Sequence, residues 1–594
     1  MEARIDSKLK WTPTLEELLY LLALVIALVM RLAILGQYHL TETEAGYALQ
    51  AYQVSQGEDL PMLGNPAYIQ LTGMLFYLLG SSDVLARLLP ALLGSAVILL
   101  PYLWREHLGD KAALVAAFGL ALDPLSIAVS RQAGSPVMAL GFFTLAVFFW
   151  QRKRMLAAGI LAGLLIMSGI SFVFALVGLL VAWAVIHFVS EIRFELKVDP
   201  QERNLVLAGI GIALVAVGTL FALEFQGLAA TVQALVDYFA GWFGGVSGQH
   251  PLAVLLGLVV YQPMGLLFAI LLWLNRSKNG EVLNILLTIL FLVFLALILV
   301  YPARGMWMLI WGVVPLWLLA GQVIGEYLGA PDEQDRILVW GSAVFYLILL
   351  VYWWMNLAQL TAEIGLVRVE GVSLLDLIAV DPASKVYVVR LLVTILVPVL
   401  ILILSGLVSW GWAADASIRG AVWGVGAFLV FYIVMAAWGF SAPPEELASE
   451  LWVQGPSVGQ TAEMMTAIEE ASTQITGTKY ELDLVYQVDS RLVDWLLRDF
   501  PNAVYSPSLS ANDLPDVVLT RDLGFMQTES GQLYGGQNFV LHLERAWGNP
   551  VLPPDFDRWL VYRKSPVEKD WVYLWTRADL FPLYEPAENS APVE

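Results

Sequence analysis

The sequence predicts a polytopic α-helical membrane protein that carries a small α/β domain at its C-terminus. Hydrophobic residues make up 58% of the 594 residues, charged residues only 14%, and the mean hydropathy is +0.70, which is beyond what a soluble globular chain carries. Apolar stretches of bilayer length recur as far as residue 440, where the composition changes to that of a soluble domain. We therefore expect a transmembrane domain over 1–440 and a soluble domain over 441–594.

About thirteen apolar stretches are long enough to cross a bilayer as a helix, which takes roughly 20 residues. They lie near residues 17–36, 82–104, 111–129, 135–150, 155–168, 171–190, 204–224, 252–274, 282–301, 305–325, 337–358, 386–409 and 418–440. The first stretch is longer than the core of a signal peptide and lacks a small-residue cleavage site, so we expect it to remain as a span.

The distribution of Lys and Arg predicts the orientation of these spans. Most basic residues fall in the N-terminus and in alternate loops, whereas the other loops before residue 440 hold only Arg131, Arg304, Arg368 and Lys385. Since Lys and Arg gather in cytoplasmic segments, the N-terminus is predicted to be cytoplasmic. An odd number of spans then makes the C-terminal domain extracytoplasmic, in a multi-pass protein of the cell membrane.

Charge and cysteine content exclude some classes of partner and site. The formal net charge is −20, and no basic stripe is present, which argues against nucleic acid as a partner. The chain contains no cysteine, so it has neither disulfides nor cysteine-ligated metal.

The first outer loop, residues 37–81, contains two carboxylates just after the first span. Glu42 and Glu44 are separated by one residue in a loop that has no Lys or Arg. In one interpretation Thr41 or Thr43 caps a helix whose first turn holds Glu44, where the helix dipole favours a carboxylate. In the other, the two carboxylates hold a divalent metal ion or act as a general base.

Two outer loops each place one arginine near the membrane. Arg131 follows Asp123-Pro124, and Arg304 lies in the short connection 301–307 between two spans. An arginine there could bind a phosphate or extend its side chain to the interface. For Arg304, which is held close to the hydrocarbon, an anionic headgroup is a natural partner.

Two further segments have a recognisable pattern. The pattern of residues 225–251 predicts an amphipathic helix that lies on the outer face. The same segment could equally be a lid or a packing element. In the soluble domain we expect a helix over 490–500 and strands over 482–488, 503–505, 516–519, 538–543, 559–562 and 571–575. No phosphate-binding glycine loop or nucleophile elbow occurs there. His542 is expected to belong to the core or to a sugar-stacking surface, with the core favoured, rather than to serve as a ligand.

The N-terminal 150 residues resemble the C-type (GT-C) membrane glycosyltransferases, in particular the protein O-mannosyltransferase and lipid A aminoarabinose transferase group. The resemblance rests on a first span that ends in Arg31, the acidic pair and the run 45–52 after it, the run 80–94, and Asp123-Pro124 followed by Ser130-Arg131. Residues 301–307 and 495–500 resemble motifs that bacterial and archaeal members of the family carry further along the chain. Two positions depart from it: members commonly carry Asp-Glu where this chain has Glu-Thr-Glu, and Ser135 stands where relatives often have an acidic residue.

The resemblance implies an enzyme that transfers a hexosyl or pentosyl group from a polyprenyl phosphosugar to a protein, glycolipid or glycan acceptor on the outer face. It implies Glu44 as the first catalytic carboxylate and Glu42 as the second, with a divalent metal ion held by the pair as a further option. Arg131 and Arg304 are the implied contacts of the donor phosphate, and Tyr47 and Tyr301 those of the substrate. The alternatives are a non-catalytic subunit or scaffold with the same fold, and a transporter or lipid flippase.

Overall fold

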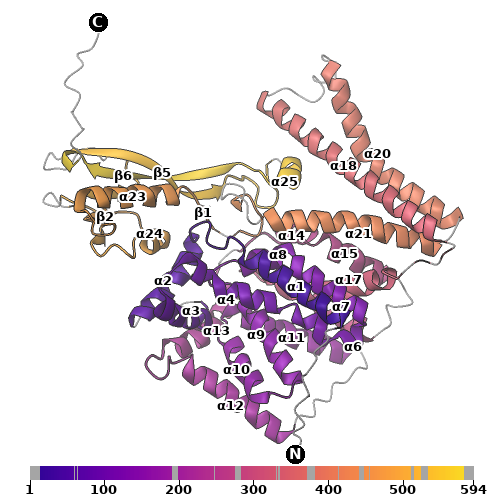
Figure 1. Ribbon diagram of the computed structural model, residues 1–594, viewed down its shortest axis with the longest axis horizontal. Coiled ribbons are helices and arrows are strands. Elements are labelled where there is room, and N and C mark those ends of the chain that lie inside the picture. The colour runs from indigo at the N-terminus through magenta and orange to yellow at the C-terminus, as the bar shows by residue number, and fades with distance from the viewer. Residues whose placement is uncertain are drawn as a thin grey trace, which may run out of the picture.

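The computed structural model of the chain is mainly helical, with a mixed sheet at one end (Figure 1). It describes residues 14–58, 61–62, 64–189, 199–245, 248–274, 282–329, 331, 333, 335–370, 382–411, 414–439, 447–453, 455–509, 514–523, 533–554 and 556–580. The helices up to α17 form one body, the sheet lies across one end of it, and α18 and α20 project as a hairpin (Figure 1).

The helical body begins with the following elements: α1 (Leu15–Leu32), α2 (Glu42–Gln56), α3 (Pro66–Leu79), α4 (Asp83–Ala96), α5 (Leu99–Leu103), α6 (Arg105–Leu108), α7 (Asp110–Leu122), α8 (Pro124–Ser130), α9 (Val137–Gln151), α10 (Met155–Ile166), α11 (Ile170–Val189) and α12 (Pro200–Ala216). It continues with α13 (Gln226–Phe243), α14 (Pro251–Tyr261), α15 (Pro263–Leu274), α16 (Val282–Val300), η1 (Met306–Leu309) and α17 (Ile310–Tyr327). The helices that follow the body are α18 (Arg336–Glu370), α20 (Pro382–Gly411) and α21 (Ala414–Gly439).

Seven helical segments in the described part of the chain are long and apolar enough to span a membrane, and two bent helix pairs raise the number to nine. The seven are Asp83–Leu103, Ile170–Phe188, Val282–Val300, Met306–Tyr327, Arg336–Ala362, Val389–Leu407 and Ala416–Gly439. Their number supports a membrane protein, whereas the predicted count of thirteen is not confirmed within the described residues. One reason is length, because α10 has only 12 residues and is about 18 Å long, less than the roughly 30 Å of a hydrocarbon core.

Two predicted spans are bent at a proline. Helices α7 and α8 meet at 51° before Pro124, and α14 and α15 meet at 90° before Pro263. Proline removes a backbone donor and clashes with the preceding turn, so it favours a kink or a break there. The residues at the two breaks are buried and joined, since the Gln262 amide donates a hydrogen bond to Asp123, which also accepts one from Trp317 Nε1 at 3.0 Å.

Helix α17 lies at the centre of the helical body. Within the segment Met306–Tyr327, 94% of an 18-residue apolar window is buried, and Trp317 packs directly on Gly119 of α7. A Cβ atom at Gly119 would lie 2.2 Å from Trp317 Cε3, so only glycine allows this approach of the two helices.

The predicted loop 37–81 is largely helical, as α2 and α3 lie within it. The predicted amphipathic segment forms α13, whose apolar side chains at Leu235, Val236, Phe239 and Phe243 are about half exposed or more. Such a face suits a helix at a membrane surface.

The C-terminal sheet unit, residues 455–580, contains six strands in the order β1-β5-β6-β4-β2-β3. Its elements are β1 (Ser457–Val458), α23 (Thr461–Thr476), β2 (Leu484–Tyr486), α24 (Arg491–Leu496), β3 (Ala503–Tyr505), β4 (Val517–Thr520), β5 (Tyr534–Arg545), α25 (Phe556–Tyr562), β6 (Val567–Arg577) and η2 (Ala578–Leu580). Strands β2, β3 and β4 pair in parallel, and the β5–β6 hairpin joins β4 in antiparallel fashion. The prediction of a strand over 559–562 is wrong, because these residues belong to α25, which packs on α18 and buries Trp559 completely.

Candidate active site

The first outer loop places its two carboxylates through the start of α2. Thr41 is the N-cap residue: its hydroxyl accepts a hydrogen bond from Glu44 N at 3.4 Å, and Glu44 Oε2 accepts one from Thr41 N at 3.0 Å. This reciprocal capping box satisfies two free backbone donors at the helix start. The expectation of a capped helix is therefore confirmed, and the cap turns Glu44 inward, where it is 4% exposed.

Arg87 of α4 holds the Glu44 carboxylate in a bidentate ion pair. Its Nε and Nη2 donate to the two carboxylate oxygens at 2.8 Å each, and its remaining donors reach the carbonyls of Leu35, Tyr38 and His39. Ala133 N also donates to Glu44 Oε1 at 2.9 Å. Burial alone would raise the pKa of Glu44, but Arg87 and the backbone donors hold it below its ordinary value of 4.5. The carboxylate thus stays ionised at neutral pH.

Glu42, two residues earlier, points toward the C-terminal sheet unit. It accepts hydrogen bonds from Ser490 Oγ and Arg491 N, both at 2.6 Å, and so caps α24. Its Oε2 also lies 3.1 Å from Nε2 of His542, whose Nδ1 lies 3.2 Å from Asp570 Oδ2. His542 is buried between these two carboxylates, so it joins β5 and β6 to the first outer loop.

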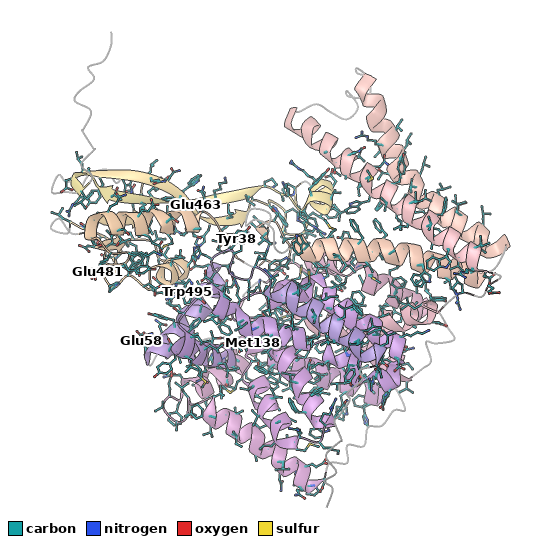
Figure 2. The ribbon with its side chains drawn as sticks, viewed as in Figure 1. Tyr38, Glu58, Met138, Glu463, Glu481 and Trp495 are labelled. Atoms are coloured by element: carbon teal, nitrogen blue, oxygen red, sulfur yellow. The ribbon has the colours of Figure 1, made fainter. Side chains whose placement is uncertain are left out.

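A second set of contacts fixes the same interface. Trp495 Nε1 donates to Asp83 Oδ1 at 2.7 Å, and His39 Nδ1 lies 2.9 Å from the other carboxylate oxygen. Arg498 stacks over the Trp495 ring at 3.8 Å and donates to Ser81 Oγ at 3.0 Å. Figure 2 shows Trp495 and Tyr38 at the boundary between the C-terminal sheet unit and the helices. Two clusters of polar contacts therefore dock the sheet unit on α2 and α4.

The docking through Glu42 is expected to weaken in acid. Burial by itself would raise the pKa of Glu42, but hydrogen bonds from His542, Ser490, Arg491 and Leu492 lower it to about 2. Because docking lowers the pKa of Glu42, its carboxylate stabilises the docked state at any pH above 4.5, the ordinary pKa of the group. This stabilisation is lost as the pH falls toward 2. Because the chain has no cysteine, spin labels at Gln56→Cys and Glu463→Cys can report the distance between α2 and α23. We expect this distance to increase below pH 4.5 and the Glu42→Gln variant to lose the part of the increase that depends on Glu42. An unchanged pH dependence in the variant would contradict the assignment.

Two cavities lie on either side of Glu44. The arginine cavity, of about 110 Å³, is lined by Ile34, Leu35, Tyr38, His39, Thr41, Glu44, Arg87, Ala128, Arg131, Gln132, Leu447, Trp452, Val453, Ser457 and Val458. The hydroxyl cavity, of about 270 Å³, is lined by Thr41, Thr43, Glu44, Tyr47, Gly64, Asn65, Val129, Gln132, Ala133, Gly134, Ser135, Pro136, Ser168, Gly169, Ile170, Ser171, Trp307 and Trp452. Thr41, Glu44, Gln132 and Trp452 are common to both. Glu44 thus forms part of the wall between a cationic compartment and one rich in neutral polar groups.

Tyr47 is held over the floor of the hydroxyl cavity by two glycines. A Cβ atom at Gly134 would lie 2.3 Å from Tyr47 Cδ2, and one at Gly64 would lie 2.6 Å from Tyr47 Cε1. Gly134 also has φ +70°, which a residue with a side chain rarely adopts. The ring is therefore fixed between two backbone segments, where it can serve as a stacking surface.

The other predicted site residues lie at different distances from these cavities. Arg131 lines the arginine cavity, and its Nη1 donates to carbonyls of residues 30, 31 and 33 at the end of α1. Burial and the nearby Arg87 charge lower the pKa of Arg131 to about 10, with Glu44 opposing, so the group remains charged at neutral pH.

Tyr301 and Arg304 line neither cavity within the described part of the chain. The Tyr301 ring stacks on Tyr238 at 5.0 Å and its hydroxyl donates to Tyr238 O at 3.1 Å. Arg304 donates to the carbonyls of Ile298 and Gln249 at 3.2 and 3.0 Å. Their roles in substrate and phosphate binding stay predictions.

Two residues of this site were not assigned a role from the sequence. Arg87 could have been recognised, because an arginine inside a bilayer-length apolar run needs a partner. His542 carried no such signal, since its partner Glu42 lies 500 residues away in the chain.

The two carboxylates do not fit a metal ion held between them. Glu44 is directed to Arg87 and Ala133, whereas Glu42 is directed to α24 and His542. Among the residues that the structure describes, no group of three or more His, Asp or Glu side chains is arranged to hold a metal. A divalent site needs more oxygen ligands than this pair could supply.

The arrangement of the helices is similar to that of solved membrane proteins. The crystal structure of ArnT from Cupriavidus metallidurans bound to undecaprenyl phosphate matches with a TM-score of 0.51 and 14% identity, over 84% of this chain and 92% of that one. Its apo form gives a TM-score of 0.48 with the same identity and coverage. The archaeal oligosaccharyltransferase AglB from Archaeoglobus fulgidus, in complex with an inhibitory peptide and a dolichol-phosphate, gives 0.38 with 12% identity, over 85% and 69% of the two chains.

Comparison with family models gives no match, and comparison with curated proteins gives none either. The likeness to ArnT concerns the fold, at an identity too low to carry a function by itself. The chain therefore has the fold of ArnT, in agreement with the resemblance to C-type glycosyltransferases predicted from its sequence.

Proposed function

We propose that the chain is a membrane glycosyltransferase that moves a sugar from a polyprenyl-phosphate-linked donor to an acceptor on the outer face of the membrane. The pair of cavities separated by Glu44 carries this proposal, because it offers a cationic compartment beside a hydroxyl-rich one. The fold shared with ArnT, which was crystallised with undecaprenyl phosphate, supports the class of lipid. The orientation follows from the Lys and Arg distribution, with the N-terminus cytoplasmic and the C-terminal sheet unit extracytoplasmic.

Arg131 is our proposed contact of the donor phosphate in the arginine cavity. A guanidinium has five N–H donors, and the hydrogen bonds of Arg131 to the end of α1 all come from Nη1. Donors on Nη2 and Nε can therefore face a phosphate oxygen. Arg87 adds positive charge to the same cavity while it stays paired with Glu44.

Glu44 is our proposed acceptor of the hydrogen bond from the incoming hydroxyl group. Thr41 Oγ1 donates to Glu44 Oε2 at 3.1 Å, and both residues line both cavities, so an acceptor hydroxyl can replace the threonine hydroxyl there. In the transfer, the bond from the sugar C1 to the phosphate oxygen breaks and a bond from C1 to the acceptor oxygen forms. The acceptor proton passes to the departing phosphate, whose second pKa of about 6 exceeds that of Glu44. Glu44 remains an anion and acts electrostatically.

The hydroxyl cavity favours an uncharged sugar. Its polar lining consists of hydroxyl and amide side chains, and Glu44, the one charged residue among the described lining residues, is paired with Arg87. Tyr47, Trp307 and Trp452 add aromatic surface that suits the apolar faces of a sugar ring. An amino sugar would find no carboxylate available to it here, and an acidic sugar would lie next to Glu44.

The test is release of polyprenyl phosphate by the purified chain in lipid, with a panel of neutral, amino and acidic polyprenyl phosphosugars and with protein, glycolipid and glycan acceptors. We expect turnover with a neutral hexose or pentose donor, and at least about tenfold lower turnover with the amino sugar of the same shape, as one lost favourable contact of about 1.4 kcal/mol predicts. Preference for the amino sugar would contradict the assignment of the hydroxyl cavity.

A specific observation favours a second function, that of a non-catalytic subunit or scaffold. Glu44 accepts five hydrogen bonds, from Arg87 Nε and Nη2, Ala133 N, and Thr41 N and Oγ1, so all of its acceptor capacity is engaged. No turnover with any donor, by a chain that still folds and binds the lipid, would favour this alternative.

A further inference from the structure

A third cavity lies outside the candidate active site, where α21 and α18 meet the C-terminal sheet unit. It has a volume of about 380 Å³ and shares no lining residue with the arginine or hydroxyl cavity within the described part of the chain. One part of its wall is apolar, formed by Trp354, Phe428, Phe431 and Met435. The other part contains Arg563, which follows α25 directly.

The apolar side opens toward the surface that α21 exposes. Phe431 is 61% exposed and Met435 is 55% exposed, and both line the cavity. Helix α21 contains a candidate membrane span, so this surface is expected to face lipid chains. The C-terminal end of α21 lies beside the sheet unit (Figure 1), and aromatic side chains such as Trp354 and Tyr432 line the cavity there, as is usual at a membrane–water boundary.

Arg563 is held in the polar part of the cavity by its backbone and by neighbouring rings. It has φ +55°, which costs energy for a residue with a side chain, and its guanidinium packs over Trp559 at 4.7 Å. Its Nη2 donates to Tyr432 Oη at 2.6 Å, and its Nε lies 3.9 Å from Glu450 Oε1. Its Nη1 is buried without a hydrogen-bond partner among the described residues.

Arg563 keeps one guanidinium donor for an anion although Glu450 faces it. Glu450 accepts a hydrogen bond from the Tyr261 hydroxyl in addition to facing Arg563. A buried donor without a partner costs free energy that a charged oxygen ligand would recover.

We propose that this cavity binds an anionic phospholipid, with its phosphate on Nη1 of Arg563 and one acyl chain along Phe431 and Met435 of α21. A bound lipid would contact both α25 and α21. It would thereby stabilise the packing of the C-terminal sheet unit against the last span. The site is separate from the one at which the proposed transfer takes place.

Native mass spectrometry and lipid titration of the full chain test this site, with phosphatidylglycerol and phosphatidylcholine of equal chain length as probes. We expect phosphatidylglycerol to bind the wild type at least about tenfold more tightly, and Arg563→Gln to remove this preference. Arg558→Gln is the matched control, because Arg558 is an exposed arginine of α25, the helix that Arg563 follows, and it should leave binding unchanged. If Arg563→Gln does not fold, Met435→Trp, which fills the mouth of the cavity and keeps Arg563, should reduce binding instead.

Three results would overturn the proposal. Equal binding of both lipids would leave only an apolar groove without a role for Arg563. Loss of the preference in Arg558→Gln would indicate a non-specific surface charge effect. Competition by inorganic phosphate as strong as that by the lipid would indicate a site for a free anion.

Discussion

Arg87→Met is expected to destabilise the protein by about 3–5 kcal/mol, as measured by unfolding in detergent. The substitution removes both bonds to the Glu44 carboxylate and leaves that carboxylate buried without its counter-charge. It also removes the hydrogen bonds that Arg87 donates to the backbone carbonyls of Leu35, Tyr38 and His39 in the turn between α1 and α2. Because α2, α4 and the turn that follows α1 all meet at this guanidinium, its loss should destabilise this part of the site.

The double variant Arg87→Met with Glu44→Gln provides the control for this prediction. Removing both charges leaves no uncompensated ion, so the double variant should lose clearly less stability than the sum of the two single variants. Strictly additive losses would show that the two residues do not act as an ion pair.

Glu44→Gln is expected to lower turnover by about 100-fold or more, the loss that follows removal of a well-placed electrostatic contact. Glutamine keeps the size of the side chain but supplies neither the negative charge nor both acceptor oxygens. Glu58→Gln is the matched control, since Glu58 is an exposed carboxylate just beyond the other end of α2 and should be dispensable. Glu42→Gln tests the prediction that Glu42 is a second catalytic carboxylate; on our assignment to docking, its effect should be mainly on the position of the sheet unit.

Much of the fold followed from local patterns in the sequence. Apolar runs located most of the helices, and alternation located β3 and β4 to within one residue. Hydropathy does not show where an apolar run bends, so it predicts continuous spans across the breaks at Pro124 and Pro263. Residues 559–562 have strand-like composition, yet the packing of Trp559 and the hydrogen bond from its Nε1 to Ser449 O fix them as a helix.

The candidate site was predictable only where its signal was local. The helix cap and the place of Glu44 in the first turn follow from four consecutive residues, although the sequence left the cap open between Thr41 and Thr43. By contrast, the separation of Glu42 from Glu44 depends on His542 and Ser490, which the fold brings from the far end of the chain. Tyr301 lies only a few residues before Trp307 in the sequence, yet it does not line the cavity that Trp307 lines.

The most direct test of the central claim is release of polyprenyl phosphate from a neutral polyprenyl phosphosugar by the wild type and by Glu44→Gln, measured side by side in lipid. We predict release by the wild type and loss of about 100-fold or more in the variant, with donor binding retained through Arg131. Equal release by both proteins would contradict transfer at Glu44.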